Sequence, residues 1–263
     1  MEPMWRVIGV SVQGTSHQKN HLPCQDAHRY RVLPGGAALI AVADGAGSAD
    51  RSDEGAQCAV AETIASIEAA LAEGQPQDEA GWQALLTEVF RQARQAVAEL
   101  AEAENVPSRA FATTLTCAVV SDEWLAVGQI GDGVAVARGE DGELFAVTQP
   151  QHGEYANETF FLTMDEPLQQ VQVQVYLRPI QALAVMTDGL IRLAMNVSRN
   201  EPHHPFFQPL LAFAARIEDE AGAQEQLMGF LASDRICART DDDKTLVLAV
   251  RSEIPVDLEP AGG

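Results

Sequence analysis

Basic residues are scarce in this chain. Against 38 Asp and Glu there are only 17 Lys and Arg, which gives a formal net charge of −21 over 263 residues. Nucleic-acid binding depends on neutralising phosphates with Lys and Arg, so this balance disfavours nucleic acid as a partner. It disfavours an anionic membrane surface for the same reason. The composition fits a soluble protein that has a use for carboxylates.

Cysteines are also few, and long apolar runs are missing. The four cysteines (Cys24, Cys58, Cys117 and Cys237) form no CxxC pair, so we expect reduced thiols in the cytoplasm. No stretch approaches the length that spans a bilayer. The first ten residues lack the basic and apolar parts of a signal peptide. We therefore expect a cytoplasmic protein without a membrane segment.

Familiar nucleophile and phosphate-binding motifs are absent as well. There is no GxSxG, and none of the cysteines has an arginine six residues on. Residues 128–133, GQIGDG, match neither a dinucleotide fingerprint nor a P-loop. The loop after Asp44 fails as an EF-hand, because Ala49 holds the glycine position and Gly55 the glutamate position. The sequence therefore offers no recognisable protein nucleophile, so any hydrolysis of a phosphate ester would depend on direct attack by water.

What the sequence does contain is a repeated pattern in which an apolar run ends on an aspartate. One run leads to Asp44-Gly45, others lead to Asp132-Gly133 and Asp188-Gly189, and Asp241–Asp243 precedes the last apolar run. An apolar run bounded by turn residues predicts a buried strand. Ionising a carboxylate where apolar packing stops is costly without a cation or hydrogen-bond donors. Four acidic strand ends predict one carboxylate site assembled from distant segments.

Each Asp-Gly pair has a simpler interpretation, because Asp-Gly is a strong signal for a tight hairpin turn. Asp141-Gly142 lies between polar flanks and is typical of such a turn. Asp132-Gly133 could be another, since a new apolar run follows at once. After Asp44 and Asp188 helical sequence follows instead of a return strand. The set of four argues for chemistry, although no single member does.

Two long amphipathic helices follow the first acidic strand end. Their apolar stripes extend over Ala56–Leu71 and Trp82–Leu100. From Phe111 onward, period-two apolar patterning predicts consecutive antiparallel strands in a meander, with turns at Ser121-Asp122 and Asp141-Gly142. We expect an α+β fold in which helices cover the outer faces of the sheets.

Three further segments do not follow these periodicities. Gly14–Asp26 is polar and is expected to be a loop, and Thr148–Pro167 is too long and aperiodic to be a plain turn. No composition shift marks a domain boundary, so we expect one domain over residues 1–252. Residues 253–263 are expected to form a flexible tail.

The donor types at the acidic strand ends favour a hard cation. Aspartates beside a glycine carbonyl, without a cysteine or histidine cluster at the same points, suit Mg²⁺ or Mn²⁺. Two such ions about 3.5–4 Å apart can clamp a phosphoryl group and activate a water. A rival set, His17, His21, Cys24 and His28, has a spacing that could suit zinc.

In order and spacing, these motifs resemble the metal-dependent type 2C Ser/Thr protein phosphatases in their compact bacterial form. The resemblance extends from Gly9 to Val250, and it rests on six short motifs. These are CQDA (24–27), VADG (42–45), TTL (113–115), IGDG (130–133), MTDGL (186–190) and DDKT (242–245). It implies a four-layer α-β-β-α sandwich of two antiparallel sheets flanked by helices, with the metals at one end. Residues 148–167 would occupy the place of the family's variable flap.

The resemblance implies two Mg²⁺ or Mn²⁺ ions, with a weaker third. The implied metal ligands are Asp26, Asp44, Gly45 through its carbonyl, Asp132 for the third ion, Asp188 and Asp242. It further implies hydrolysis of phosphoserine and phosphothreonine in proteins by a water that the two ions activate, with Asp44 and Asp188 at the centre of catalysis. The implied partner is a phosphorylated protein in a bacterial signalling pathway. A cognate Ser/Thr kinase remains open as a second partner, and we expect a monomer.

Three positions depart from the family pattern. Gln25 replaces one carboxylate of an acidic pair, Ala46 replaces a histidine that serves as a proposed leaving-group acid, and the phosphate-binding arginine upstream of Asp26 is missing. His17 is therefore a candidate to bind phosphate or to donate a proton. These departures motivate an alternative, a phosphatase-like regulatory module with weak or no activity that binds a partner kinase or phosphoprotein.

Overall fold

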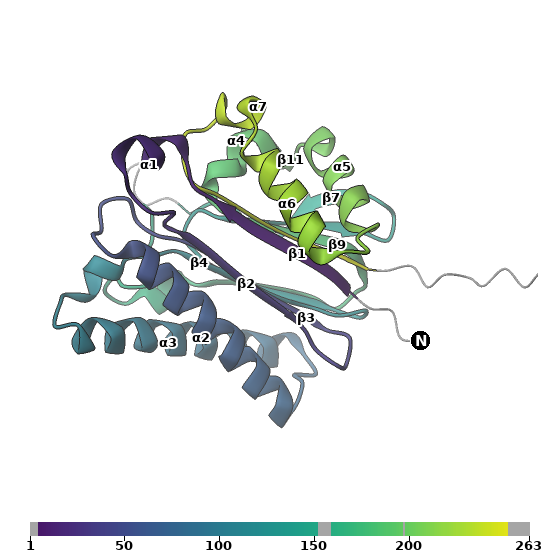
Figure 1. Ribbon diagram of the computed structural model, residues 1–263. Coiled ribbons are helices and arrows are strands. Elements are labelled where there is room, and N and C mark those ends of the chain that lie inside the picture. The colour runs from purple at the N-terminus through teal and green to yellow at the C-terminus, as the bar shows by residue number, and fades with distance from the viewer. Residues whose placement is uncertain (1–4, 152–158, 197, 252–263) are drawn as a thin grey trace, which may run out of the picture.

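The computed structural model describes residues 5–151, 159–196 and 198–251, and two antiparallel sheets form its centre (Figure 1). The first sheet has the strand order β1-β12-β9-β6-β7. Its strands are β1 (Trp5–Val12), β6 (Val134–Gly139), β7 (Leu144–Ala146), β9 (Ile180–Met186) and β12 (Lys244–Arg251). The second sheet has the order β2-β3-β4-β5-β8. Its strands are β2 (Asp26–Val32), β3 (Ala38–Asp44), β4 (Leu115–Val120), β5 (Leu125–Ile130) and β8 (Gln172–Tyr176).

Helices cover the outer face of each sheet, as Figure 1 shows. The two long helices α2 (Ser52–Glu73) and α3 (Glu79–Ala103) lie on the second sheet, while α5 (His204–Ala214) and α6 (Glu220–Leu231) lie on the first. The remaining elements are short. They are α1 (Thr15–Asn20), η1 (Ser108–Phe111), η2 (Pro167–Gln170), η3 (Asp188–Leu190), α4 (Ile191–Ala194), the pair β10 (Met195–Asn196) and β11 (Glu201–Pro202), and α7 (Asp234–Cys237).

Strand alternation explains the layers. In β3, Ile40 and Val42 point between the sheets, whereas Leu39 and Ala41 pack under α2 and α3. In β12, Val247 faces the space between the sheets and Leu248 faces the helices α5 and α6. Strands buried on both faces are continuously apolar, as the sequence of these runs is. The predicted α+β sandwich with helices outside two antiparallel sheets is confirmed.

Two local predictions were wrong. The strands after Phe111 do not form one meander, because the chain leaves the second sheet after β5 and enters the first at β6. Asp132-Gly133 therefore joins two sheets and is not a hairpin turn. The segment Gly14–Asp26 is not wholly a loop, since it contains α1 and Asp26 already begins β2. Period-two patterning specifies strands, but it does not specify which sheet each strand joins.

Two other expectations concern segments that lie wholly or partly outside the described residues. Residues 252–263, which include the expected tail, and residues 152–158 of the expected flap are not described. Asp141-Gly142 does form the β6–β7 turn, with Gly142 at a φ of 84°. Within the described ranges, no helix combines the length and the apolar character needed to cross a membrane.

Candidate metal centre

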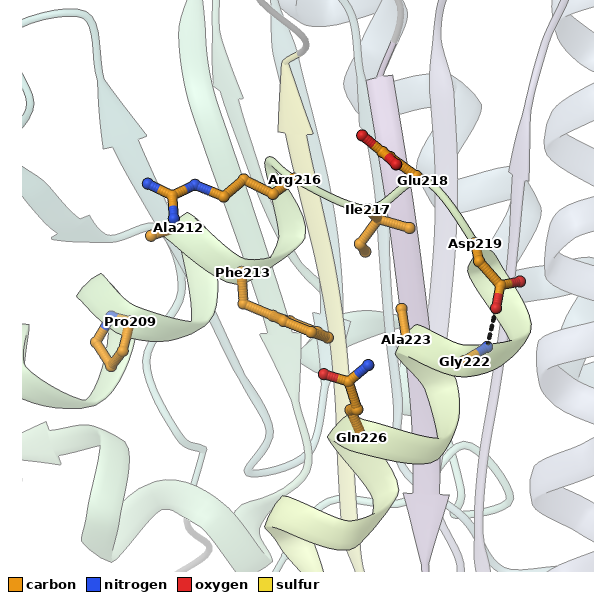
Figure 2. A pocket seen from close by; sticks show the side chains of 10 residues that line it. All are labelled: Pro209, Ala212, Phe213, Arg216, Ile217, Glu218, Asp219, Gly222, Ala223 and Gln226. Carbon is orange, nitrogen blue, oxygen red and sulfur yellow. Dashed lines mark hydrogen bonds between the residues drawn. The ribbon is translucent and has the colours of Figure 1, made fainter.

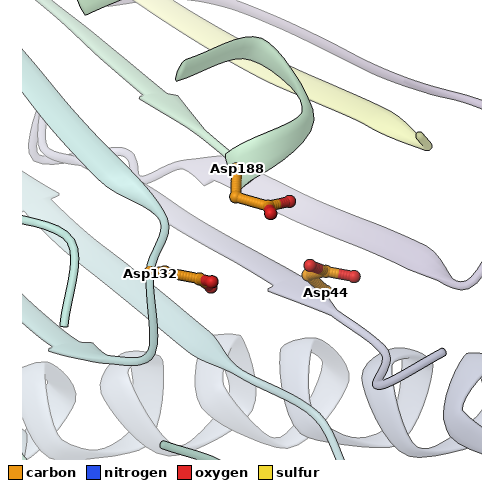
Figure 3. A group of neighbouring side chains, drawn as sticks. All are labelled: Asp44, Asp132 and Asp188. Carbon is orange, nitrogen blue, oxygen red and sulfur yellow. The ribbon is translucent and has the colours of Figure 1, made fainter. Parts of the chain in front are cut away.

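Three aspartates from distant parts of the chain converge at one end of the sandwich (Figure 3). Asp44 ends β3, Asp132 lies in the connection from β5 to β6, and Asp188 begins η3, one residue beyond the end of β9. One carboxylate oxygen of each lies within 4.8 Å of the others. The antiparallel pairing explains this, because the end of β3, the start of β6 and the end of β9 meet at the same end of the two sheets.

Asp26 and Asp242 lie beside this group. Asp26 is directly opposite Asp44 in the β2–β3 register and is only 6% exposed. The Thr187 hydroxyl donates a hydrogen bond of 2.8 Å to the Asp26 carboxylate. Asp242 is more exposed and lines the same hollow as Asp44, Asp132 and Asp188, a hollow of about 210 Å³. The structure thus brings all five predicted aspartates to one end of the molecule.

Hydrogen bonds to Thr113 and Thr114 fix the backbone around Asp44. The Asp44 amide donates to the Thr114 hydroxyl at 2.9 Å, and the Asp44 carbonyl accepts from the Thr114 amide at 2.8 Å and the Thr113 hydroxyl at 3.0 Å. Gly45 lines the hollow, and a Cβ at this position would lie 2.7 Å from the Ser52 backbone. Glycine is therefore required here because the neighbouring chain approaches so closely.

Crowding of carboxylates shapes the electrostatics of the site. Burial, reinforced by the neighbouring aspartates, raises the pKa of Asp26 to about 8 and the pKa of Asp188 to about 7. Burial, followed by the charges of Asp26 and Asp188, raises the pKa of Asp44 well above its usual range. The pKa of Asp242 is also raised, mainly by burial. Like charges held this close disfavour ionisation, and a divalent cation would reverse that effect.

Asp243 organises the N-terminal side of the site, and sequence reasoning gave it no role. Its carboxylate is 2% exposed and accepts hydrogen bonds from the Gly14 amide (2.5 Å), the Gln25 amide (2.5 Å) and His17 Nδ1 (2.9 Å). His17 is on α1 and lines the hollow with the aspartates. The acidic triplet 241–243 predicted a carboxylate at this position. Only the structure shows that Asp242 lines the hollow while Asp243 is buried beside it.

Gln25 and Ala46, the two departures from the family pattern, also line the hollow. Gln25 is 5% exposed, and its side-chain oxygen has no hydrogen-bond partner among the described residues. A buried orphan acceptor is costly unless a water or cation satisfies it. Ala46 packs with Ala49, Ala112 and Phe161 in a small apolar cluster beside the aspartates.

The rival zinc set is not assembled. His17 is bound to Asp243, while His28 Nδ1 is bound to the Ser11 hydroxyl at 2.8 Å on the inner face of β2. Among the described residues, the one group of at least three converging His, Cys, Asp or Glu side chains is Asp44, Asp132 and Asp188. These oxygen donors fit Mg²⁺ or Mn²⁺ and not a zinc site of sulfur and nitrogen ligands.

A larger hollow of about 500 Å³ lies elsewhere, at the junction of α5 and α6 (Figure 2). Its two acidic side chains, Glu218 and Asp219, do not converge in the view of Figure 2, and Asp219 caps α6 by accepting a hydrogen bond of 3.1 Å from the Gly222 amide. Phe213 and Ile217 supply apolar side chains to the same hollow. Size alone therefore does not identify the functional site, whereas converging carboxylates do.

Comparison with known proteins identifies the family of the chain. A family model described as "Protein phosphatase 2C" matches residues 13–232. The chain is 36% identical over 256 residues to "Serine/threonine-protein phosphatase 3" of Escherichia coli (strain K12), covering 95% of this chain and 99% of that protein. The chain belongs to the protein phosphatase 2C family.

Solved structures share the fold at low sequence identity. The catalytic domain of the serine threonine protein phosphatase PstP, solved in complex with two manganese ions, superposes with a TM-score of 0.64 at 19% identity, covering 95% of this chain and all 100% of that one. The serine/threonine phosphatase Stp1 from Staphylococcus aureus gives a TM-score of 0.62 at 13% identity, covering 95% and 96% of the two chains. Both similarities support the two-sheet architecture.

Proposed function

We propose that this chain is a metal-dependent protein phosphatase that hydrolyses phosphoserine and phosphothreonine. The observation that carries the proposal is the convergence of Asp44, Asp132 and Asp188 within 4.8 Å in a member of the protein phosphatase 2C family. Mg²⁺ or Mn²⁺ is the cofactor that suits these donors. The proposed ligands are Asp26, Asp44, the Gly45 carbonyl, Asp188 and Asp242 for two ions, with Asp132 for a weaker third.

The site suits such ions on its own chemistry. Its donors are all oxygens, and burial together with mutual repulsion raises the pKa of several of them. When bound, paired divalent ions supply positive charge to the phosphate and lower the pKa of a water. Gln25, through its unpartnered oxygen, is placed to accept a hydrogen bond from a water in the hollow. Thr159 donates a hydrogen bond of 2.7 Å to Asp132 and so fixes one of its oxygens.

His17 is proposed as the acid that protonates the leaving group. Its Nδ1 is bound to Asp243, so the ring orientation is fixed and Nε2 remains for the substrate. Hydrolysis breaks the bond between phosphorus and the serine oxygen, and the proton from Nε2 would pass to that oxygen as it leaves. This role would compensate for Ala46, which cannot donate a proton.

The alternative of a non-catalytic phosphatase-like module is not favoured. A module that only binds would have no need to keep a cluster of buried like charges, which is costly in the folded protein. All five aspartates nevertheless lie together at one end of the sandwich. The departures at Gln25 and Ala46 alter groups around this cluster and leave the carboxylates in place.

The proposed function is tested by assaying the purified chain on a phosphoserine peptide and on p-nitrophenyl phosphate. We expect hydrolysis of both with Mn²⁺ and loss of both when EDTA is added, with recovery when Mn²⁺ is returned in excess. A chain that is folded by circular dichroism, yet shows no Mn²⁺-dependent release of phosphate from either substrate, would contradict the proposal.

Replacing His17 with alanine should separate the two substrates. The serine alkoxide is a strong base and needs a proton to leave, whereas p-nitrophenolate leaves without one. We expect the kcat for the phosphopeptide to fall by about 10²-fold, with little change for p-nitrophenyl phosphate. An equal loss on both substrates would assign His17 to phosphate binding or to local structure instead.

The finer context of the enzyme is also a proposal. The four cysteines are free in the described structure, which suits a reducing cytoplasm. We place the enzyme there as a monomer in a bacterial signalling pathway, acting on a phosphorylated protein, with a cognate Ser/Thr kinase as the source of that substrate. The pairing is tested in vitro. Such a kinase first phosphorylates the protein, and we expect this chain to remove the phosphate from the same residues.

A further inference from the structure

A further hollow, of about 190 Å³, lies where α4, α5, α6 and α7 meet on the outer side of the first sheet (Figure 1). Phe206 and Ile236 line it, and both are nearly buried in the apolar core under these helices. Phe230 lines it as well, is 36% exposed, and has its ring centroid 6.5 Å from that of Phe206. The hollow therefore presents a concave apolar surface that one large side chain would cover.

Arginines mark the edge of this hollow, which we call the arginine hollow. Arg235 and Arg239 line it, both are exposed, and neither guanidinium has an ion-pair or hydrogen-bond partner among the described residues. No acidic side chain of the described residues lines it, since Asp234, next to Arg235 in sequence, is not part of its lining. Acidic groups farther off are screened beyond about 10 Å at 0.1 M salt. The lining is thus positive in a chain whose net charge is −21.

The arginine hollow is close to the candidate metal centre, because two chain segments lead from one to the other. Leu193 lines the hollow and follows Asp188 by five residues through η3 and α4, a helical path of roughly 10 Å. Arg239 precedes Asp242 by three residues, which span at most about 10 Å. A protein segment seated in the hollow would therefore lie only a few residues from the metal centre.

We propose that the arginine hollow is a docking site for an acidic segment of the phosphorylated substrate protein. One large apolar side chain of that segment would pack against Phe206 and Phe230, and flanking carboxylates would pair with Arg235 and Arg239. The inference rests on the proposed phosphatase function. Guanidinium groups bind carboxylates with paired hydrogen bonds, and an apolar anchor in a pocket supplies much of the affinity of an interface. The negative charge of the rest of the chain disfavours an acidic segment elsewhere on its surface.

The first experiment measures binding without catalysis. The probe is an unphosphorylated, fluorescein-labelled peptide in which two glutamates flank a phenylalanine on each side, and fluorescence anisotropy follows its binding to the full chain. We expect saturable binding that weakens about 10-fold or more in the double variant Arg235→Glu with Arg239→Glu. Changing the phenylalanine of the peptide to alanine, or its glutamates to lysines, should weaken binding by about as much. Both arginines are exposed, so their replacement should not unfold the protein.

Arg29→Glu with Arg91→Glu is the matched control, because it changes the net charge equally. Both of these arginines are exposed, and they lie in β2 and α3, on the other side of the sandwich. The dissociation constant should stay within about two-fold of the wild-type value, as expected for distant sites. An equal loss in the two double variants would mean that the peptide responds only to total charge, and it would overturn the inference.

A competing occupant is the C-terminal segment of this chain, residues 252–263, which also combines acidic with apolar residues. The triple variant Ile254→Ser, Val256→Ser and Leu258→Ser removes its apolar side chains without changing its charge. We expect peptide binding to be unchanged in this variant. Binding that becomes about 10-fold tighter or more would show that the segment competes for the hollow, and the hollow would then be a site for this chain itself rather than for a substrate.

The second experiment joins the same acidic peptide to a phosphoserine peptide through six Gly and Ser residues, before the phosphoserine in one version and after it in another. With Mn²⁺, at least one version should have a KM about 10-fold or more below that of its lysine counterpart, at similar kcat. Arg235→Glu with Arg239→Glu should remove this difference and leave hydrolysis of p-nitrophenyl phosphate unchanged. Equal KM values in the wild type would overturn the inference, even if the peptide binds. Peptide binding without any Mn²⁺-dependent hydrolysis would instead overturn the proposed function.

Discussion

Asp44→Ala is expected to reduce phosphatase activity by at least about 10³-fold. Removing one group that stabilises the transition state electrostatically costs about 10²–10³, and Asp44 is in addition a proposed ligand of both metal ions. Its carboxylate lies among those of Asp26, Asp132, Asp188 and Asp242, all of which raise its pKa. The rate on p-nitrophenyl phosphate with Mn²⁺ measures the loss.

The same substitution should not unfold the protein. The contacts of Asp44 to Thr113 and Thr114 use its backbone, which alanine retains. Removing one carboxylate from a crowded group also relieves repulsion in the metal-free state. We therefore expect the metal-free melting temperature to stay level or rise. The wild type should gain about 2.7 kcal/mol of stability at Mn²⁺ concentrations 100-fold above its dissociation constant, and the variant should gain much less.

Asp141→Ala is the matched control, since Asp141-Gly142 is the same dipeptide in an ordinary turn. Its carboxylate accepts a hydrogen bond from the Glu143 amide at 3.1 Å in the turn between β6 and β7. We expect full activity and a loss of stability of about 1 kcal/mol or less. Comparable losses of activity in both variants would mean that Asp44 acts through its turn and not through a metal site.

The layers of the fold could be predicted because they follow from local patterns. Apolar runs such as Leu39–Ala43 specify strands, and the stripes within α2 and α3 specify the faces that they bury. The assignment of strands to sheets could not be predicted in the same way. β5 and β6 are adjacent in sequence but lie in different sheets, and this crossing depends on long-range packing that no local pattern records.

The aspartate cluster could be predicted because each of its aspartates stands at one end of an apolar run. When such runs pair as antiparallel strands, their ends meet at the ends of the sheets. The supporting groups gave no such signal. Ser11, Thr245 and His28 belong to three strands and become partners only when the two sheets stack. Asp243 and its neighbour Asp242 both precede β12, and they differ in that the Asp242 side chain lines the hollow whereas the Asp243 side chain is buried. Single hydroxyls and neighbouring acids therefore acquire their roles from the fold.

Gly189→Ala is expected to damage the fold and the site together. Gly189 follows Asp188 in η3, and a Cβ at this position would overlap the backbone carbonyl oxygen of Asp243. A backbone atom cannot rotate aside as a side chain can, so the loop before β12 must move away from η3. That movement would separate Asp188 from Asp242 and disturb the hydrogen bonds that Asp243 accepts.

We expect Gly189→Ala to cost about 3 kcal/mol, the upper part of the usual range for overpacking. In a protein of this size, that corresponds to a melting temperature lower by roughly 6–12 °C. Mn²⁺-dependent activity should fall by at least about 10²-fold even at temperatures where the variant is folded. Thermal unfolding followed by circular dichroism, with activity measured at a temperature well below the transition, separates the two effects.

Gly229→Ala supplies the matched comparison, because Gly229 lies within α6 and a Cβ there would meet nothing within 4 Å. Alanine in an exposed helical position should stabilise the protein by about 0.5–1 kcal/mol and leave activity unchanged. If Gly189→Ala were tolerated as well as Gly229→Ala, the loop before β12 would have to be able to shift freely. That result would contradict the idea that the close packing of η3 against Asp243 fixes the position of Asp188 relative to Asp242.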